Sequence, residues 1–172
     1  PRFRVMTVFD VSQTYGEPLP EIETPELMGN VENYDTFLQA VREVSPVPIR
    51  FDNIESGAKG YYSSADKEIV IQEGLSERQT MKTGIHETVH AKLHDRDVME
   101  ELGEKKSQMT KEVEAESTAY VVCQYFGLDT SDYSFPYIAG WSSGMEMREL
   151  RASMDTIRRT AGEFIDSMTE VL

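Results

Sequence analysis

Two histidines four residues apart, His86 and His90, have the spacing in this sequence that most directly suggests chemistry. On a helix, positions four residues apart differ by only about 40° around the axis and by about 6 Å along it. Both imidazoles can therefore face one ion, and histidine nitrogens bind zinc at about 2.0–2.1 Å. The pair predicts a metal site, with Zn²⁺ as the expected ion.

Glu87 follows the first histidine directly and lies about 100° further round the helix, beside the predicted metal rather than on it. From there its carboxylate can take a proton from a water that zinc has made more acidic. The pattern His-Glu-x-x-His on a helix is typical of zinc metallopeptidases, in which the glutamate is the general base. We therefore expect Glu87 to be catalytic and the substrate to be a protein or peptide.

A catalytic zinc with two histidines needs a third protein ligand and an open position for water. The next expected helix carries Glu112, Glu114 and Glu116. At 100° per residue, Glu112 and Glu116 share the apolar stripe of this helix, whereas Glu114 lies about 200° away. We expect Glu112 to be the ligand, Glu116 to accept the free N–H of a ligating imidazole, and Glu114 to face solvent. The reverse assignment of Glu112 and Glu116 stays open.

Two further residues near the motif have less direct interpretations. His94 lies about 12 Å along the helix axis from His86, too far to share one tetrahedral ion, so we expect it to line the cleft or cap the helix. Cys123 is the single cysteine and is expected to pack in the core as a small hydrophobic residue. One cysteine forms no internal disulfide, which favours a reducing, cytoplasmic setting.

The elements that must position these residues are mostly strands in the first half of the chain and helices in the second, which is typical of an α+β domain. Ser76 begins the helix that carries the histidines, with Gln79 in the position of its capping-box partner. Gly127 ends the next helix. We expect strands over 3–11, 48–53, 59–63 and 68–72, and helices from 35 to before 46, over 76–94, over 110–126 and over 145–172, the last with a possible break near Gly162.

The strands over 59–63 and 68–72 are candidates for an edge that pairs with a substrate backbone. Tyr61 or Tyr62 can donate a hydrogen bond to a developing oxyanion. The alternative, which we favour, is that both tyrosines pack the sheet.

Length and charge limit the function further. A chain of 172 residues is long enough for one domain with a sizeable core, and its apolar stretches are too short to span a membrane. The net charge of −14, from 17 basic and 31 acidic residues, disfavours contact with a phosphate backbone. We expect that this domain itself binds no nucleic acid.

The motif and the segments before it resemble known metallopeptidases. His86-Glu87-x-x-His90 followed by Glu112-x-x-Ala115-Glu116 is similar to the gluzincin layout of the zincins. Gly60-Tyr61-Tyr62, the following strand and the motif helix resemble the ImmA/IrrE-type metallopeptidases of bacteria and their mobile elements. The resemblance implies a zincin-like fold with a small sheet, and Glu112 as the third ligand.

Other segments are similar to the C-terminal zincin domain of ArdC-like antirestriction proteins of bacterial mobile elements. They are Thr7–Thr14, Ala115–Cys123 and Tyr137–Trp141. This second resemblance matches the ligand glutamate to Glu116, a position where Asp or Asn is usual. It also implies a preceding domain that binds single-stranded DNA, and an antirestriction or repressor-cleaving role for the whole protein.

The expected organisation follows from these observations. Residues 1–30 are expected to be a strand and linker that leave a preceding domain, because the sequence begins at Pro1 and residues 16–30 are rich in Pro and Gly. Residues 31–172 are expected to form the zincin-like metallopeptidase domain. The alternative is a non-catalytic acidic interaction module, an antirestriction protein or DNA mimic, with a structural zinc.

Overall fold

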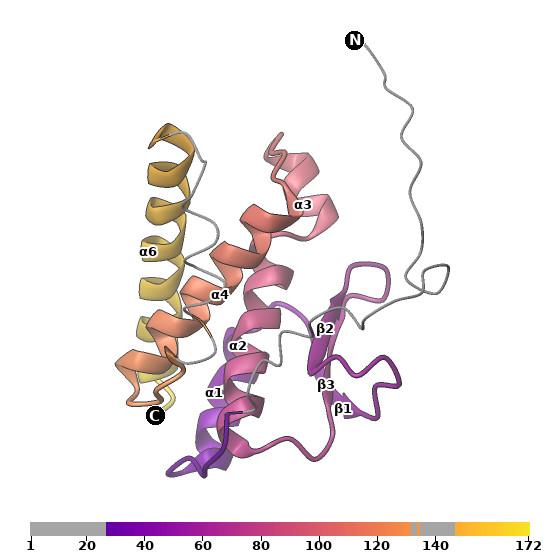
Figure 1. Cartoon of the computed structure of the whole chain (residues 1–172), viewed down its shortest axis with the longest axis vertical. Helices are drawn as coiled ribbons and strands as arrows, with labels where there is room; N and C mark the ends of the chain where they lie inside the picture. Colours follow the sequence, from indigo (N-terminus) through magenta and orange to yellow (C-terminus); the bar gives the residue numbers. More distant parts are fainter. Residues whose placement is uncertain (1–26, 132–133, 135–146) are drawn as a thin grey trace, which may run out of the picture.

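Helix α2 (Glu77–Leu93) lies between a small sheet and helix α4 (Gln108–Tyr125), and α6 (Met147–Thr169) covers the opposite side of α4 (Figure 1). The computed structural model describes residues 27–131, 134 and 147–172. The architecture is α+β, as predicted. The expected strand over 3–11 lies outside the described residues. The other elements are α1 (Tyr34–Val44), β1 (Ile49–Asp52), β2 (Gly60–Ser63), β3 (Glu68–Gln72) and α3 (Arg96–Glu101).

The three strands form one sheet in the order β1-β3-β2. Strand β3 lies in the middle, where it pairs in parallel with β1 and antiparallel with β2. Its Ile69, Val70 and Ile71 are all buried, which explains why β3 reads as a continuous apolar run. Strand β2 is therefore an edge of this sheet, and it packs against α2.

The start of α2 is fixed by its cap and by the segment that precedes α1. Ser76 is the N-cap and accepts a hydrogen bond from the backbone N–H of Gln79, as predicted. The Gln79 side chain does not complete a capping box. It is buried, accepts from the backbone N–H of Leu27 at 3.1 Å and donates to Thr83 Oγ1 at 3.1 Å. Residues 27–31 are thereby held against the first turns of α2.

The later helices agree with the sequence except in one place. Helix α4 ends before Gly127, whose φ of 77° places it in the left-handed region, as a C-terminal glycine requires. Helix α6 runs through Gly162 without a break. The short helix α3 was not predicted. It begins at its N-cap Asp95, immediately after His94.

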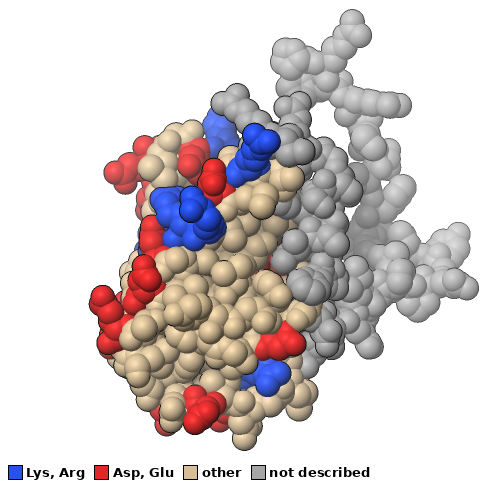
Figure 2. All heavy atoms as spheres, turned by 90° about the vertical axis from the view of Figure 1, so that its left-hand side faces the viewer, with Lys and Arg blue, Asp and Glu red and all other residues tan. Residues whose placement is uncertain are grey.

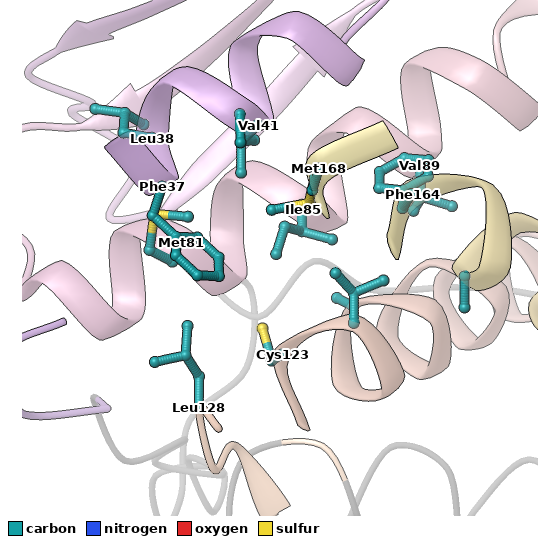
Figure 3. Close-up of a cluster of buried hydrophobic side chains, with 14 of the residues drawn as sticks. Phe37, Leu38, Val41, Met81, Ile85, Val89, Cys123, Leu128, Phe164 and Met168 are labelled. Carbon is teal, nitrogen blue, oxygen red and sulfur yellow. The ribbon is translucent and has the colours of Figure 1, made fainter. Parts of the chain in front are cut away.

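The main core lies where α1, α2, α4 and α6 meet (Figure 3). Ile85 and Val89 of α2, Cys123 of α4 and Phe164 of α6 are fully buried in it. Cys123 thus packs as a small hydrophobic residue, as predicted, and burial raises the pKa of its thiol to about 12. No helix in the described part of the chain is long and apolar enough to cross a bilayer.

A buried carboxylate, Asp95, ties the turn between β2 and β3 to the junction of α2 and α3. It accepts hydrogen bonds from the Tyr62 hydroxyl at 2.6 Å, Ser64 Oγ at 2.8 Å and Lys67 Nζ at 2.8 Å. Burial opposes ionisation of Asp95, but these donors outweigh it and hold its pKa below the ordinary value. The edge strand is therefore fastened next to the end of the motif helix.

Replacement of Asp95 by asparagine should lower the free energy of unfolding at neutral pH by about 2–4 kcal/mol, because charge-assisted hydrogen bonds are lost at a buried site. The lowered pKa of Asp95 means that its contribution is present above the unfolded-state pKa of about 3.9 and is lost as pH falls through the folded-state pKa. Urea unfolding of wild type and D95N should therefore differ most near pH 7 and converge in acid.

Asp97 provides the matched control, because it also contacts Lys67, at 2.6 Å, but its side chain is 74% exposed. Exposed ion pairs contribute at most about 1 kcal/mol, so D97N should stay close to wild type. Equal losses for D95N and D97N would contradict the role given to Asp95.

Candidate metal centre

Helices α2 and α4 bring His86, His90 and Glu112 together in one group that could hold a metal ion. The two Nε2 atoms lie 3.1 Å apart. Glu112 Oε2 lies 3.5 Å from each of them. Each residue thus points one ligand atom toward a common centre.

The size of this triangle fits a tetrahedral ion. Two bonds of about 2.0–2.1 Å at a tetrahedral angle hold their outer atoms about 3.3 Å apart. The three measured separations, 3.1, 3.5 and 3.5 Å, lie on either side of that value. Two histidines and one glutamate are also one of the ligand sets of catalytic zinc sites. The residues present therefore fit a zinc ion.

The electrostatics of the group favour a positive charge at its centre. Burial lowers the pKa of His86, but the carboxylates of Glu112 and Glu116 outweigh it and raise that pKa to about 9. Hydrogen bonds to His86 and His90 in turn hold the pKa of Glu112 well below its usual range. The negative charges of Glu112 and Glu116 stabilise the protonated form of His86, and they would stabilise a bound metal cation in the same way.

Glu116 lies behind the first histidine rather than in the triad. Its Oε2 is 3.0 Å from His86 Nδ1, an ion-pair distance that does not meet hydrogen-bond geometry. The same carboxylate accepts from Lys82 Nζ at 2.5 Å and from Ser134 Oγ at 2.6 Å. Burial raises the pKa of Glu116, but His86 and Lys82 lower it overall to about 2. This glutamate is thus ionised and lies beside the imidazole of His86.

Glu114 was predicted to face solvent, and that prediction is wrong. Its side chain is only 1% exposed, where it accepts a hydrogen bond from Lys106 Nζ at 2.9 Å and lies 3.0 Å from His94 Nε2. The reason is that α4 is covered on two sides, by α2 and by α6. The prediction assumed that α4 has one buried face and that the opposite face is exposed. Because α4 is buried on two faces, that assumption placed Glu114 in solvent incorrectly.

His94 was expected to line the cleft or to cap the helix, and it does both. It is the C-cap of α2 and it lines a cavity beside the triad, and it is not among the three residues grouped around a common centre. What the sequence reasoning missed is its contact with His90, whose Nδ1 lies 3.0 Å from His94 Nδ1. The repeated four-residue spacing of the histidines was the available signal.

Two hollows flank the triad, with volumes of about 280 Å³ and 420 Å³. Gly60, His86, Glu87 and Glu112 border both of them. A Cβ at Gly60 would lie only 2.6 Å from Thr83 Cγ2, so glycine is what allows the edge strand to approach α2 here. Glu87 therefore lies at the junction of two hollows, beside the triad.

The two tyrosines of the edge strand differ in their surroundings. The Tyr62 hydroxyl donates to Asp95, and burial together with that carboxylate raises the pKa of Tyr62 to about 12. Tyr61 is partly exposed and lines the larger hollow. Tyr62 lines the same hollow, but its hydroxyl is hydrogen-bonded to Asp95.

Comparisons with known proteins find a similar sequence and a similar solved structure. The chain is 32% identical over 183 residues to an uncharacterized protein of Bacillus anthracis, pXO2-81, in an alignment that covers 94% of this chain and 30% of that protein. The chain thus spans less than a third of the length of this relative. No protein-family profile matches the chain.

Among solved structures, the chain is similar to the antirestriction ArdC protein of the R388 plasmid in its Mn(II)-bound form. The TM-score is 0.45 and the sequence identity is 21%, over 95% of this chain and 60% of that one.

Proposed function

We propose that this chain is a zinc-dependent metallo-endopeptidase domain with a zincin-like, gluzincin arrangement of its site. His86, His90 and Glu112 would hold the ion, and Glu87 would be the general base. The observation that carries the proposal is the triangle of ligand atoms, with edges of 3.1, 3.5 and 3.5 Å, which is bordered by two hollows and by a buried glutamate.

The chemistry divides between the ion and the chain. A bound zinc supplies a Lewis acid that polarises a carbonyl and acidifies water. The Glu87 carboxylate accepts a proton at the edge of both hollows and returns it to the leaving amine. The β2 edge offers backbone hydrogen bonds to an extended peptide, and Tyr61 beside it can donate to an oxyanion.

A structural zinc is less well supported by the same site. Structural sites have four protein ligands in a closed tetrahedron. Within the described residues, the group contains only His86, His90 and Glu112. The hollows border this group and leave space for a substrate where a fourth ligand would otherwise close the site.

The non-catalytic acidic module gains no support from the face that carries α6. Figure 2 shows acidic side chains spread around the margin of that face, interspersed with basic ones, with uncharged atoms in the centre. A mimic of a phosphate backbone requires a continuous row of negative charge. The charges on this face therefore give no reason to prefer the acidic binding module over the peptidase.

The role of the longer protein is part of the proposal. Its basis is the resemblance of the sequence to ImmA/IrrE-type peptidases and to the ArdC-like antirestriction proteins. A cytoplasmic protein of a mobile element, with a protein or peptide substrate and with nucleic-acid binding left to a preceding domain, is consistent with that resemblance.

Metal removal and reloading test the activity. The purified chain, stripped with a chelator, should cut no member of a peptide library, and cleavage at internal bonds should return with one zinc per chain. Mass spectrometry of new termini measures both states. Mn(II) should bind more weakly than Zn(II), as the usual order of affinities requires. A zinc-loaded chain that produces no new termini would favour the non-catalytic module.

A further inference from the structure

A line of three polar groups runs from the second histidine of the triad into the interior between α2, α4 and α6. His90 Nδ1 lies 3.0 Å from His94 Nδ1. On the other side of its ring, His94 Nε2 lies 3.0 Å from Glu114 Oε2. The side chains of His94 and Glu114 are only 2% and 1% exposed.

Only one arrangement of protons satisfies this line when His90 is a ligand. A metal on Nε2 of His90 requires its proton on Nδ1. That N–H must donate to Nδ1 of His94, which then carries its own proton on Nε2 and donates it to the Glu114 carboxylate. Every hydrogen bond in the line then has one donor and one acceptor.

Glu114 is held by two further side chains, from the segment before α4 and from α6. Its Oε2 accepts from Lys106 Nζ at 2.9 Å, and its Oε1 accepts from Ser153 Oγ of α6 at 2.8 Å. The acceptor at the end of the line is thus a fixed carboxylate.

We infer that His94 and Glu114 are positioning residues of the metal site, which fix the tautomer and the ring orientation of His90 through the contact between the two Nδ1 atoms. This inference rests on the proposed metal site. Partners of this kind change metal affinity by about 10–100-fold when they are removed. A purely structural role, in which the pair only joins three helices, would change stability and leave affinity unaltered.

Zinc affinity of the full chain, measured by chelator competition, tests the inference. H94F keeps an aromatic ring but no nitrogen, and should weaken zinc binding about 10–100-fold. E114Q should weaken it in the same direction. H94Q should recover part of the loss, because its side-chain oxygen can accept from His90 and its amide N–H can donate to Glu114. E101Q, which changes an exposed glutamate at the end of α3 away from this line, should bind zinc like wild type.

A spectroscopic readout separates positioning from stability. Long-range ¹⁵N correlation spectra of zinc-loaded wild type should show the His90 proton on Nδ1 and protected from exchange, and H94F should lose that protection. If wild type binds zinc, and H94F and E114Q bind it equally well with an unchanged His90 signal, the positioning role is wrong and the metal site stands. If wild type binds no zinc, both are wrong. Should H94F fail to fold, E114Q and H94Q decide between the same outcomes.

Discussion

Replacement of Glu87 by glutamine should lower peptide cleavage by about 10²–10⁴-fold, the range that a positioned general base contributes, while zinc content stays at one ion per chain. The side chain borders both hollows and is not part of the ligand triangle. Glutamine has nearly the same volume, so packing at this buried position is kept. Cleavage rate and elemental analysis on the same sample measure the two effects.

The control for E87Q is the same change of charge away from the site. Glu101 ends α3 and is exposed, so E101Q should leave cleavage unaltered. Full activity in E87Q would rule out Glu87 as the base. Loss of zinc together with activity would show instead that Glu87 holds the ion, and the ligand assignment would have to change.

The second large effect distinguishes the two glutamates that the sequence left open. Glu112→Gln should weaken zinc binding by more than the roughly 100-fold upper range of an outer partner, because Glu112 Oε2 is itself one corner of the triangle. Its side chain is 42% exposed, so unfolding of the metal-free chain should change little. Calorimetric titration and urea unfolding measure the two quantities.

Glu116→Gln should show the opposite division. It breaks a buried ion pair with Lys82, for which the cost is about 3–5 kcal/mol of unfolding free energy. Its zinc affinity should fall only about 10–100-fold, because Glu116 acts on His86 from behind. If E116Q loses more affinity than E112Q, the assignment is reversed. Should E116Q fail to fold, the test rests on E112Q alone. Undiminished zinc binding by E112Q would then contradict the assignment of Glu112 as the ligand.

Local patterns made much of this structure predictable. The strand and helix bounds depend on capping residues and alternation, such as Ser76 before α2 and Gly127 after α4. The grouping of His86 and His90 depends on a four-residue spacing within one helix. Glu112 was expected beside them because it lies on the same helix face as Glu116, but its side chain is 42% exposed rather than buried.

What could not be predicted depends on contacts between distant segments. Glu114 has no local sign of burial, since its partners come from α2, α6 and the segment before α4. Lys82 was overlooked for the same reason, because a lysine on a helix is normally exposed, and only the fold places it 2.5 Å from Glu116. The helix α3 is too short for a periodic pattern to reveal it.

Helix α4 presents three glutamates at alternate positions, and each contacts a different combination of histidines. Glu112 contacts His86 and His90, Glu114 contacts His94, and Glu116 contacts His86. One inserted residue between Glu112 and Glu116 would turn the far part of the helix by about 100° and separate these contacts all at once. Among related chains, length changes should therefore occur in the exposed loop before α4, at 102–105, and be absent from 112–116.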